Sequence, residues 1–292
     1  MTEETLKERL DPLILERAPW LRRRGATAPR WVLDRMLGYH LALAVGEEMD
    51  PLPGPEIMAR VGERLAKRIE VQGLGHVPSD GAVMLVANHP TGIGDGVILH
   101  HLLSPTRPDL YFMANADILR VLPQLGHMIV PVEWREDRRS RASAKQTLLD
   151  LKAACEGGRL GIVFPSGRLA KRRKLTLHER PWMHSAAAMA RKFDMPVVPV
   201  HITARNSALF YALDALHPTL RDVTLFHETL NKDRQRYRVA FGAPIMQHDL
   251  PDKAEEATLV LREKVMALAP PHIPLGSRWM PDFGRASFPL RA

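Results

Sequence analysis

Residues 83–97 read Val-Met-Leu-Val-Ala-Asn-His-Pro-Thr-Gly-Ile-Gly-Asp-Gly-Val. The apolar run at 82–87 fits a fully buried strand, and the apolar run at 97–103 fits a helix. An imidazole, His89, leaves the strand end, and a carboxylate, Asp95, follows six residues later. The glycines between them let the backbone fold tightly, so the two side chains can meet.

A histidine held by a carboxylate is the arrangement that a general base needs. The carboxylate fixes the tautomer of the ring and stabilises the imidazolium that forms during proton transfer. The spacing of His89 and Asp95 also fits a simpler structure, in which His89 is a loop residue and Asp95 caps the following helix. Spacing alone leaves both interpretations open.

The composition is that of an ordinary globular protein, with 45% apolar and 25% charged residues among 292. Its single cysteine excludes an internal disulfide and a cysteine-rich metal site. The charged N-terminus predicts no signal peptide, and no apolar run is long enough to predict a spanning helix. A net charge of +8 indicates an anionic partner, either nucleic acid or an anionic membrane.

The order of elements predicts an α/β fold, with a layered, largely parallel or mixed central sheet flanked by helices. We expect a helical N-terminal region at 1–68, the α/β domain at 69–269 and an irregular tail at 270–292. The predicted strands are 69–73, 83–87, 109–113, 128–132, 160–164, 197–202 and 236–241. The predicted helices of this domain are 96–103, 117–122, 142–155, 183–193 and 252–268.

A second candidate for chemistry is Phe164-Pro165-Ser166-Gly167-Arg168, which follows the predicted strand at 160–164. Open α/β sheets bind ligands where strands end, and the planar fork of an arginine can bind two phosphate oxygens. The basic run 171–174 comes next, beginning with Lys171. The alternative interpretation is a solvated basic loop.

Several other site types are not indicated. The sequence has no Gly-Lys pair and therefore no P-loop, and no Gly-x-Ser-x-Gly nucleophile elbow. His178-Glu179 and His227-Glu228 lack the second histidine of a zincin. We therefore predict neither a metal nor a cofactor.

The motifs together resemble the glycerolipid and lysophospholipid acyltransferase superfamily. Five residues separate His89 from Asp95, where the usual form of the family has four, and this spacing resembles the hemolysin-like, ornithine-lipid branch. The Phe-Pro-Ser-Gly-Arg block resembles that branch too, and it lacks the Glu and Thr of the Phe-Pro-Glu-Gly-Thr-Arg block in the classical phosphatidate-forming enzymes. The similarity covers about residues 69–246, and it includes these blocks: Asn88-His89-Pro-Thr-Gly-Ile-Gly-Asp95-Gly, Gly126-x-x-Ile-Val-Pro131-Val-Glu133, Val198-Pro199-Val-His201 and Phe241-Gly242-x-Pro244-Ile245.

The resemblance implies an O-acyltransferase that moves a fatty acyl group from acyl-carrier protein or acyl-CoA to a hydroxyl of a lysophospholipid or related lipid precursor. His89 would be the general base and Asp95 would hold its ring. Backbone amides at 92–94 would stabilise the oxyanion, and Arg168 would hold a phosphate. The residues expected to bind substrate are Asn88, Gly92, Gly94, Pro165, Ser166, Gly167, Arg168 and Lys171.

The excess of basic over acidic residues then predicts peripheral attachment to the anionic, cytoplasmic face of the membrane. Nucleic acid is a disfavoured partner, because no recognised motif is present and aromatics are only 6% of residues. Two other functions remain open: a catalytically silent lipid- or acyl-carrier-binding protein, and an acyl-thioester hydrolase.

Overall fold

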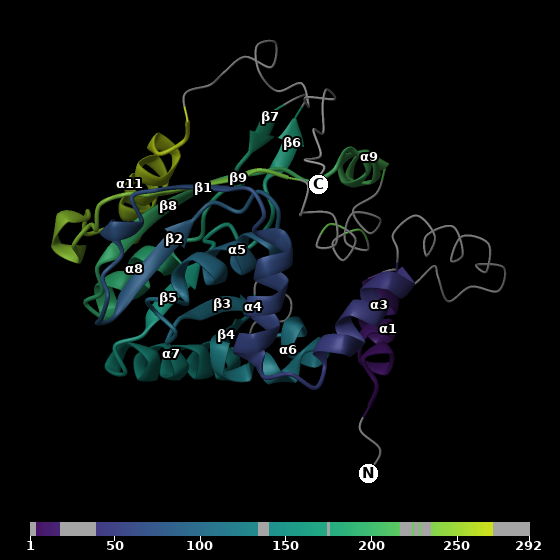
Figure 1. The fold of residues 1–292 in the computed structure, drawn as a ribbon. Coiled ribbons are helices and arrows are strands. Elements are labelled where there is room, and N and C mark those ends of the chain that lie inside the picture. The colour runs from purple at the N-terminus through teal and green to yellow at the C-terminus, as the bar shows by residue number, and fades with distance from the viewer. Residues whose placement is uncertain are drawn as a thin grey trace, which may run out of the picture.

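The computed structural model describes residues 4–17, 39–133, 140–173, 176–216, 224, 228 and 235–270. In this part of the chain, seven strands form one mixed sheet in the order β1-β9-β8-β2-β5-β3-β4 (Figure 1). Neighbouring strands run parallel except β8 and β9, which are antiparallel. The strands are β1 (Ile69–Gln72), β2 (Val83–Ala87), β3 (Tyr111–Asn115), β4 (Ile129–Val132), β5 (Leu160–Val163), β8 (Val197–Thr203) and β9 (Tyr237–Phe241). The predicted α/β class with a mixed central sheet is confirmed.

Helices cover both faces of this sheet. Successive residues of a strand point to opposite faces, so Leu85 of β2 enters one apolar core while Met84 and Val86 enter the other. The first core includes side chains of α4 (Gly54–Leu65), α5 (Ile93–Leu103), α6 (Asp117–Val121) and η3 (Pro123–Met128). The second includes side chains of α7 (Arg141–Glu156), α8 (Ser185–Lys192) and α11 (Ala254–Ala267).

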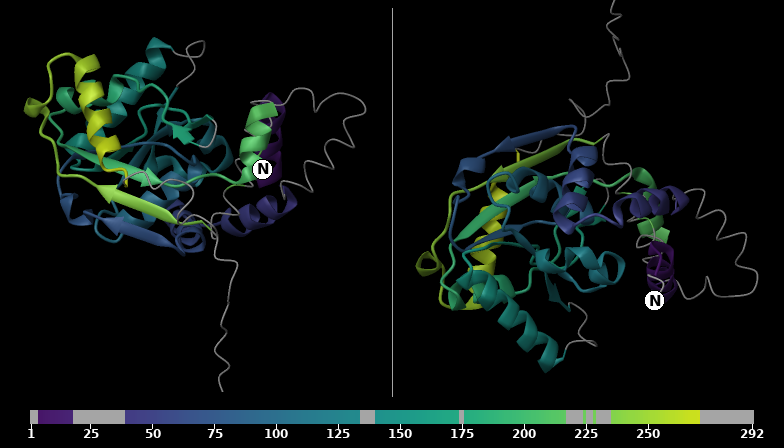
Figure 2. Two further views of the ribbon diagram at one scale, coloured as in Figure 1. Left: turned by 90° about the horizontal axis from the view of Figure 1, so that it is seen from above. Right: turned by 60° about the horizontal axis from the view of Figure 1, so that its bottom comes forward.

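The N-terminal helices form a separate apolar cluster. Leu6, Leu10 and Leu13 of α1 (Leu6–Arg17) pack with Val121 of α6. Helix α1 also contacts α3 (Tyr39–Met49), and an ion pair between Arg9 and Asp50 joins the two segments. Figure 2 shows α1 and α3 well away from α11 at the other side of the domain.

Helix α4 lies close against α5 because of one glycine. A Cβ atom added at Gly62 would lie 3.0 Å from the Cβ of His101, so a larger residue would push the helices apart. Ile57, Val61 and Leu65 form the apolar face of α4, which is directed toward the sheet, where these residues join the first core or line a cavity beside it.

Some predicted boundaries are wrong. Helix α5 begins at Ile93 rather than 96, and β3 is 111–115 rather than 109–113. The basic run at 171–174, for which a solvated loop was the alternative interpretation, is partly a strand, since β6 (Lys171–Arg173) pairs with β7 (Thr176–His178) in a small antiparallel hairpin. Helix α9 (Ala208–Leu216) and the short helices η2 (Leu74–His76) and η6 (Gln247–Asp249) were not predicted. Lys174 and the tail at 271–292 lie outside the described residues.

A buried arginine ties together the amino edge of the sheet. Arg107 is 2% exposed, and its guanidinium donates to the carbonyls of Pro78, Gly81 and Gly158, each at 2.9 Å. It also pairs with the Asp109 carboxylate at 2.7 Å, which lowers the pKa of that carboxyl through the hydrogen bond. Three loops therefore share one cation.

Within the described ranges, no helix combines the length and the apolar character that crossing a membrane would require.

Candidate active site

His89 and Asp95 come together at the carboxyl end of β2. His89 follows the strand by two residues, and Asp95 is the third residue of α5. The imidazole Nδ1 lies 2.9 Å from Asp95 Oδ2, and the carboxylate is fully buried. The two atoms are close, but the geometry is not that of a linear hydrogen bond from Nδ1–H.

The loop itself holds the Asp95 carboxylate. Oδ2 accepts hydrogen bonds from the backbone N–H groups of Thr91 (2.8 Å) and Gly92 (2.9 Å), and Oδ1 accepts one from the Thr91 hydroxyl (2.6 Å). Gly92 has a φ of 90°, a backbone conformation that favours glycine, and it is the N-cap of α5. Asp95 is therefore not the N-cap residue, but it satisfies backbone donors at the helix start and also lies against His89.

A buried tyrosine extends this hydrogen-bond network. The hydroxyl of Tyr237, on β9, lies 3.2 Å from that of Thr91. Burial, followed by the nearby charge of Asp95, raises the pKa of Tyr237, so the phenol stays neutral. His89 is thus backed by a network of three polar side chains, those of Asp95, Thr91 and Tyr237, all of them buried.

The ring of His89 is fixed from a second side by Phe164. The two rings are stacked, with centroids 4.2 Å apart and an angle of 23° between their planes. Phe164 follows β5, which is hydrogen-bonded to β2, so the carboxyl ends of two adjacent parallel strands bring these residues together. With Nδ1 toward Asp95, the other ring nitrogen, Nε2, is on the opposite side of a ring that lines the cavity described below.

The Asn88 side chain bonds to the neighbouring strand β8. Its Oδ1 accepts from the backbone N–H of Ile202 (2.7 Å) and its Nδ2 donates to the carbonyl of the same residue (2.9 Å). The Asn88 amide is thus engaged in holding the end of β2 against β8, and the role predicted for it in substrate binding stays a prediction.

Glu179 is a site residue that the sequence analysis did not identify. Its Oε2 accepts from the backbone N–H of His89 (3.3 Å), and its Oε1 accepts from the indole of Trp182 (3.2 Å). Burial raises the pKa of this carboxyl. Glu179 is 90 residues from His89 in the sequence and reaches it only because the β6–β7 hairpin folds back, so no local spacing could have revealed it.

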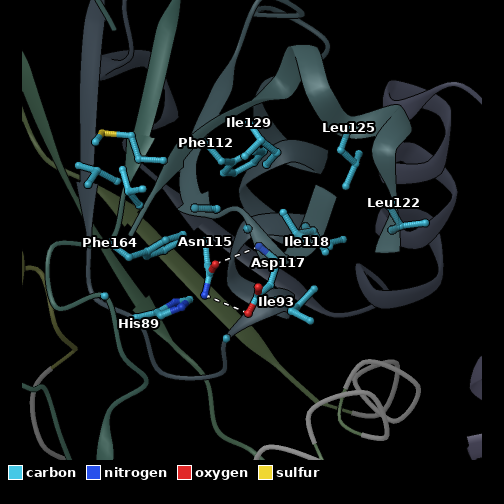
Figure 3. Close-up of a pocket in the computed structure, with 18 of the residues that line it drawn as sticks. His89, Ile93, Phe112, Asn115, Asp117, Ile118, Leu122, Leu125, Ile129 and Phe164 are labelled. Carbon is cyan, nitrogen blue, oxygen red and sulfur yellow. Dashed lines mark hydrogen bonds between the residues drawn. The ribbon is translucent and has the colours of Figure 1, made fainter. Parts of the chain in front are cut away.

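His89 opens onto a large cavity at the carboxyl edge of the sheet, with a volume of about 1470 Å³. Figure 3 shows His89 and Phe164 beside apolar side chains that come from β3, α6, η3 and β4. The part of the cavity beside α4 and α6 is mainly aliphatic and aromatic, and its lining includes Ile57, Val61, Phe112, Ile118, Leu125 and Ile129. This part of the cavity matches the chemistry of a long alkyl chain.

The other predicted substrate residues lie in different environments. Gly92, Pro165 and Gly167 line the cavity, whereas Gly94 is buried in the first turn of α5 and is not among its described lining residues. Arg168 is exposed and also outside that lining.

Two further predicted residues, Ser166 and Lys171, follow the same strand end. The Ser166 hydroxyl is buried and donates to the Arg168 carbonyl (2.7 Å). Lys171 is exposed in β6. The second motif is thus adjacent to the site, with its cations at the surface.

Comparison with known proteins agrees with this geometry. An acyltransferase family model matches residues 68–203. A lyso-glycine lipid O-acyltransferase from Bacteroides thetaiotaomicron is 27% identical over 207 residues, which are 69% of this chain and 74% of the relative. A lyso-glycine lipid O-acyltransferase from Phocaeicola vulgatus is 26% identical, covering 66% of this chain and 69% of the relative.

Among solved structures, the lysophosphatidate acyltransferase PlsC from Thermotoga maritima aligns with a TM-score of 0.48 and 17% identity, over 88% of this chain and 87% of that one. The matched family model spans β1 to β8 and includes both His89 and Asp95. Residues 68–203 of this chain thus match an acyltransferase family model, and the chain is similar to lyso-glycine lipid O-acyltransferases.

Proposed function

We propose that this acyltransferase moves a fatty acyl group from a thioester, acyl-carrier protein or acyl-CoA, to a hydroxyl of a lysolipid. The observation that carries the proposal is the position of His89. Its ring is backed by a buried carboxylate on one side and opens onto a large, mainly apolar cavity on the other. A long acyl chain fits such a cavity. A general base at the cavity wall can take the proton from the acceptor hydroxyl as its oxygen attacks the carbonyl carbon.

The reaction needs no covalent enzyme intermediate. The Nε2 atom of His89 accepts the proton of the acceptor hydroxyl while that oxygen attacks the thioester carbonyl. The carbon–sulfur bond then breaks, the thiolate leaves, and the proton on the imidazole is available to it. Asp95 stabilises the imidazolium between these steps, and Phe164 keeps the ring in place.

The oxyanion requires hydrogen-bond donors. The N–H of Gly92 is already donated to Asp95, so this amide is not one of them. The first N–H groups of a helix have no partner within it, and Ile93, at the start of α5, lines the cavity. We assign oxyanion stabilisation to the N–H group of Ile93.

The relatives narrow the acceptor class. They are named for lyso-glycine lipid, a lysolipid with an amino-acid head group. Arg168 and Lys171, exposed next to the site, would attract the anionic part of a lipid head group. We therefore expect an acceptor that combines a free hydroxyl, one long chain and an anionic head.

The test is mass spectrometry of the lipids formed when purified enzyme receives labelled acyl donors and a mixture of lyso-acceptors. The proposal predicts a new diacyl product that carries the label. Thioester cleavage without any acceptor would instead identify a hydrolase, and binding without cleavage would identify a silent lipid- or acyl-carrier-binding protein.

The membrane is the expected source of the acceptor. The net charge of +8 favours an anionic surface, and each Lys or Arg near such a surface contributes about 1 kcal/mol. We propose peripheral attachment at the cytoplasmic membrane face. Vesicles containing anionic lipid should bind the protein more than neutral vesicles, and salt near 1 M, where the screening length is about 3 Å, should weaken that binding. Equal binding to both kinds of vesicle would contradict the electrostatic argument.

A further inference from the structure

The cavity extends to both faces of the sheet. Neighbouring residues of a strand point to opposite faces, and yet Phe112 and Met113 of β3 both line the cavity, as do Val163 and Phe164 at the end of β5. Phe112 belongs to the α4–α5 side and Val163 to the α7–α8 side. The cavity therefore passes around the ends of these strands, and His89, stacked on Phe164, lies near the crossing.

The part of the cavity on the second face is a groove between α7 and α8, hereafter the α7–α8 groove. Its lining residues recur at spacings of three and four, which places them along one face of each helix. They include Ser143, Ala144 and Thr147 of α7 and Ser185, Ala188 and Lys192 of α8. Most of these side chains are exposed, so the groove is open to solvent along its length.

The two parts of the cavity differ in chemistry. The part beside α4 and α6 is mainly apolar, and its lining also includes Lys67 and Arg64, of which Arg64 pairs with Glu48 at 3.1 Å. In the α7–α8 groove the hydroxyls of Ser143 and Thr147 already donate to helix carbonyls, at 2.9 and 3.0 Å. The Ser143 oxygen also accepts from the N–H and the hydroxyl of Ser140, whereas the lone pairs of the Thr147 oxygen can still accept from an amide N–H. Lys192, at the last turn of α8, adds a positive charge.

We propose that the α7–α8 groove binds the pantetheine arm of the thioester donor, with Lys192 close to the phosphate at the end of that arm. This inference rests on the proposed function. A donor thioester joins two chains of unlike chemistry, an alkyl chain without hydrogen-bonding groups and a phosphopantetheine arm, which is pantetheine with two amides and a hydroxyl, ending in a phosphate. With the carbonyl carbon at His89, the alkyl chain occupies the apolar part and the pantetheine arm occupies the groove that offers hydroxyls and a cation.

The first test fills the groove. Ala144→Trp places an indole in it, while Ala142→Trp, on the same helix and exposed but outside the described lining, is the matched control. Each variant is assayed with acyl-CoA and with the acyl thioester of N-acetylcysteamine, which lacks most of the pantetheine arm. We expect Ala144→Trp to raise the KM for acyl-CoA about tenfold or more and to leave the KM for the short thioester unchanged. Ala142→Trp should change neither.

The second test concerns the phosphate. Lys192→Glu should raise the KM for acyl-phosphopantetheine about tenfold and leave the KM for acyl-pantetheine, which lacks the phosphate, nearly unchanged. Lys145→Glu, an exposed charge reversal on α7 outside the described lining, should affect neither donor.

Three outcomes would overturn the inference. A rise in the KM for the lysolipid instead of the donor would assign the groove to the acceptor. An unchanged donor KM in Ala144→Trp would leave the pantetheine arm elsewhere, and an equal loss with both thioesters would show general damage to the site.

The failure of the proposed function would look different. If the wild-type protein transferred no acyl group from any donor, calorimetric binding of a non-hydrolysable thioether analogue of acyl-CoA to the same variants would still test the groove. Equal affinity of wild type and Ala144→Trp for that analogue would then overturn it.

Discussion

The loops that follow β2 and β5 are neighbours at the carboxyl edge of the sheet, yet they are built in opposite ways. In the β2 loop every oxygen of Asp95 has a partner, and the carboxylate is fully buried. In the β5 loop, Gly167 and Arg168 are exposed. Because the polar groups of the β2 loop bond to one another, this loop can hold His89 in the same position for any substrate. The exposed β5 loop can change its contacts without moving His89. We therefore expect changes in the β2 loop to lower kcat for all substrates, and changes in the β5 loop to alter substrate binding.

The largest effect should come from His89→Ala. Removing a general base costs roughly 100- to 10,000-fold in rate, and the loss should be the same with every acceptor. Steady-state kinetics with two acceptors of different head group measure this, with His127→Ala, an exposed histidine, as the control. A variant that kept most of its rate while folded would disprove the proposed mechanism.

Asp95→Asn should have the next largest effect. An amide cannot stabilise the imidazolium as a carboxylate does, and its NH2 group would face the backbone N–H donors of Thr91 or Gly92. We expect kcat to fall roughly 100-fold and the free energy of unfolding to fall by about 1–3 kcal/mol. Kinetics and urea denaturation of the same preparation test both parts. A change in KM with kcat unchanged would contradict the expectation that the β2 loop affects kcat rather than substrate binding.

Arg168→Ala should have a smaller effect of another kind. Because the guanidinium is exposed, its contribution to binding an anionic head group is about 1 kcal/mol, which is about a fivefold rise in the acceptor KM. Arg168→Lys keeps the charge but loses the planar fork, so it should give an intermediate value. Acceptor and donor concentrations are varied separately. A fall in kcat with both KM values unchanged would place Arg168 in the catalytic machinery. It would contradict the expectation that the β5 loop affects only substrate binding.

The smallest effect should come from Glu179→Gln. This substitution alters the contact between the β6–β7 hairpin and the β2 loop that carries His89. Burial raises the pKa of Glu179 in the folded protein above its ordinary value of 4.5, so the neutral form is favoured by folding. The contribution of this group to stability is present below pH 4.5 and is lost as the pH rises through the raised pKa. Urea denaturation between pH 4.5 and 8 should show this loss in the wild type and a flatter profile in the variant. Parallel profiles would mean that Glu179 does not titrate in this range.

Structural features that depend on residues close together in the sequence are predicted well. Apolar runs located all seven strands of the main sheet, and a spacing of six residues located His89 and Asp95, because a helix start and a strand end bring them together over a short loop. The order of the strands, including the antiparallel pair β8–β9, depends on contacts between distant segments that no local pattern encodes.

The parts that were missed have physical reasons. The hairpin strand β6 consists of Lys171 and two arginines, which carry no alternation of apolar and polar residues. The start of α5 was placed late because Gly92 and Gly94 disfavour helix in isolation, and the Asp95 carboxylate compensates by accepting from the first backbone donors. Stacking of Phe164 on His89, and the reach of Glu179 to the same residue, exist only in the folded chain.

The buried guanidinium of Arg107 has a consequence for the way the domain opens. It connects three loops at the amino edge of the sheet, opposite the edge that carries His89. If any of those carbonyls moved away, a buried N–H of the guanidinium would lose its acceptor, which is costly. This edge should therefore open only when the whole sheet unfolds. In hydrogen–deuterium exchange, the amides near Gly81 and Gly158 should therefore be among the slowest, while those of the exposed loop at Gly167 exchange early. Local opening would then be confined to the carboxyl edge of the sheet, where His89 lies.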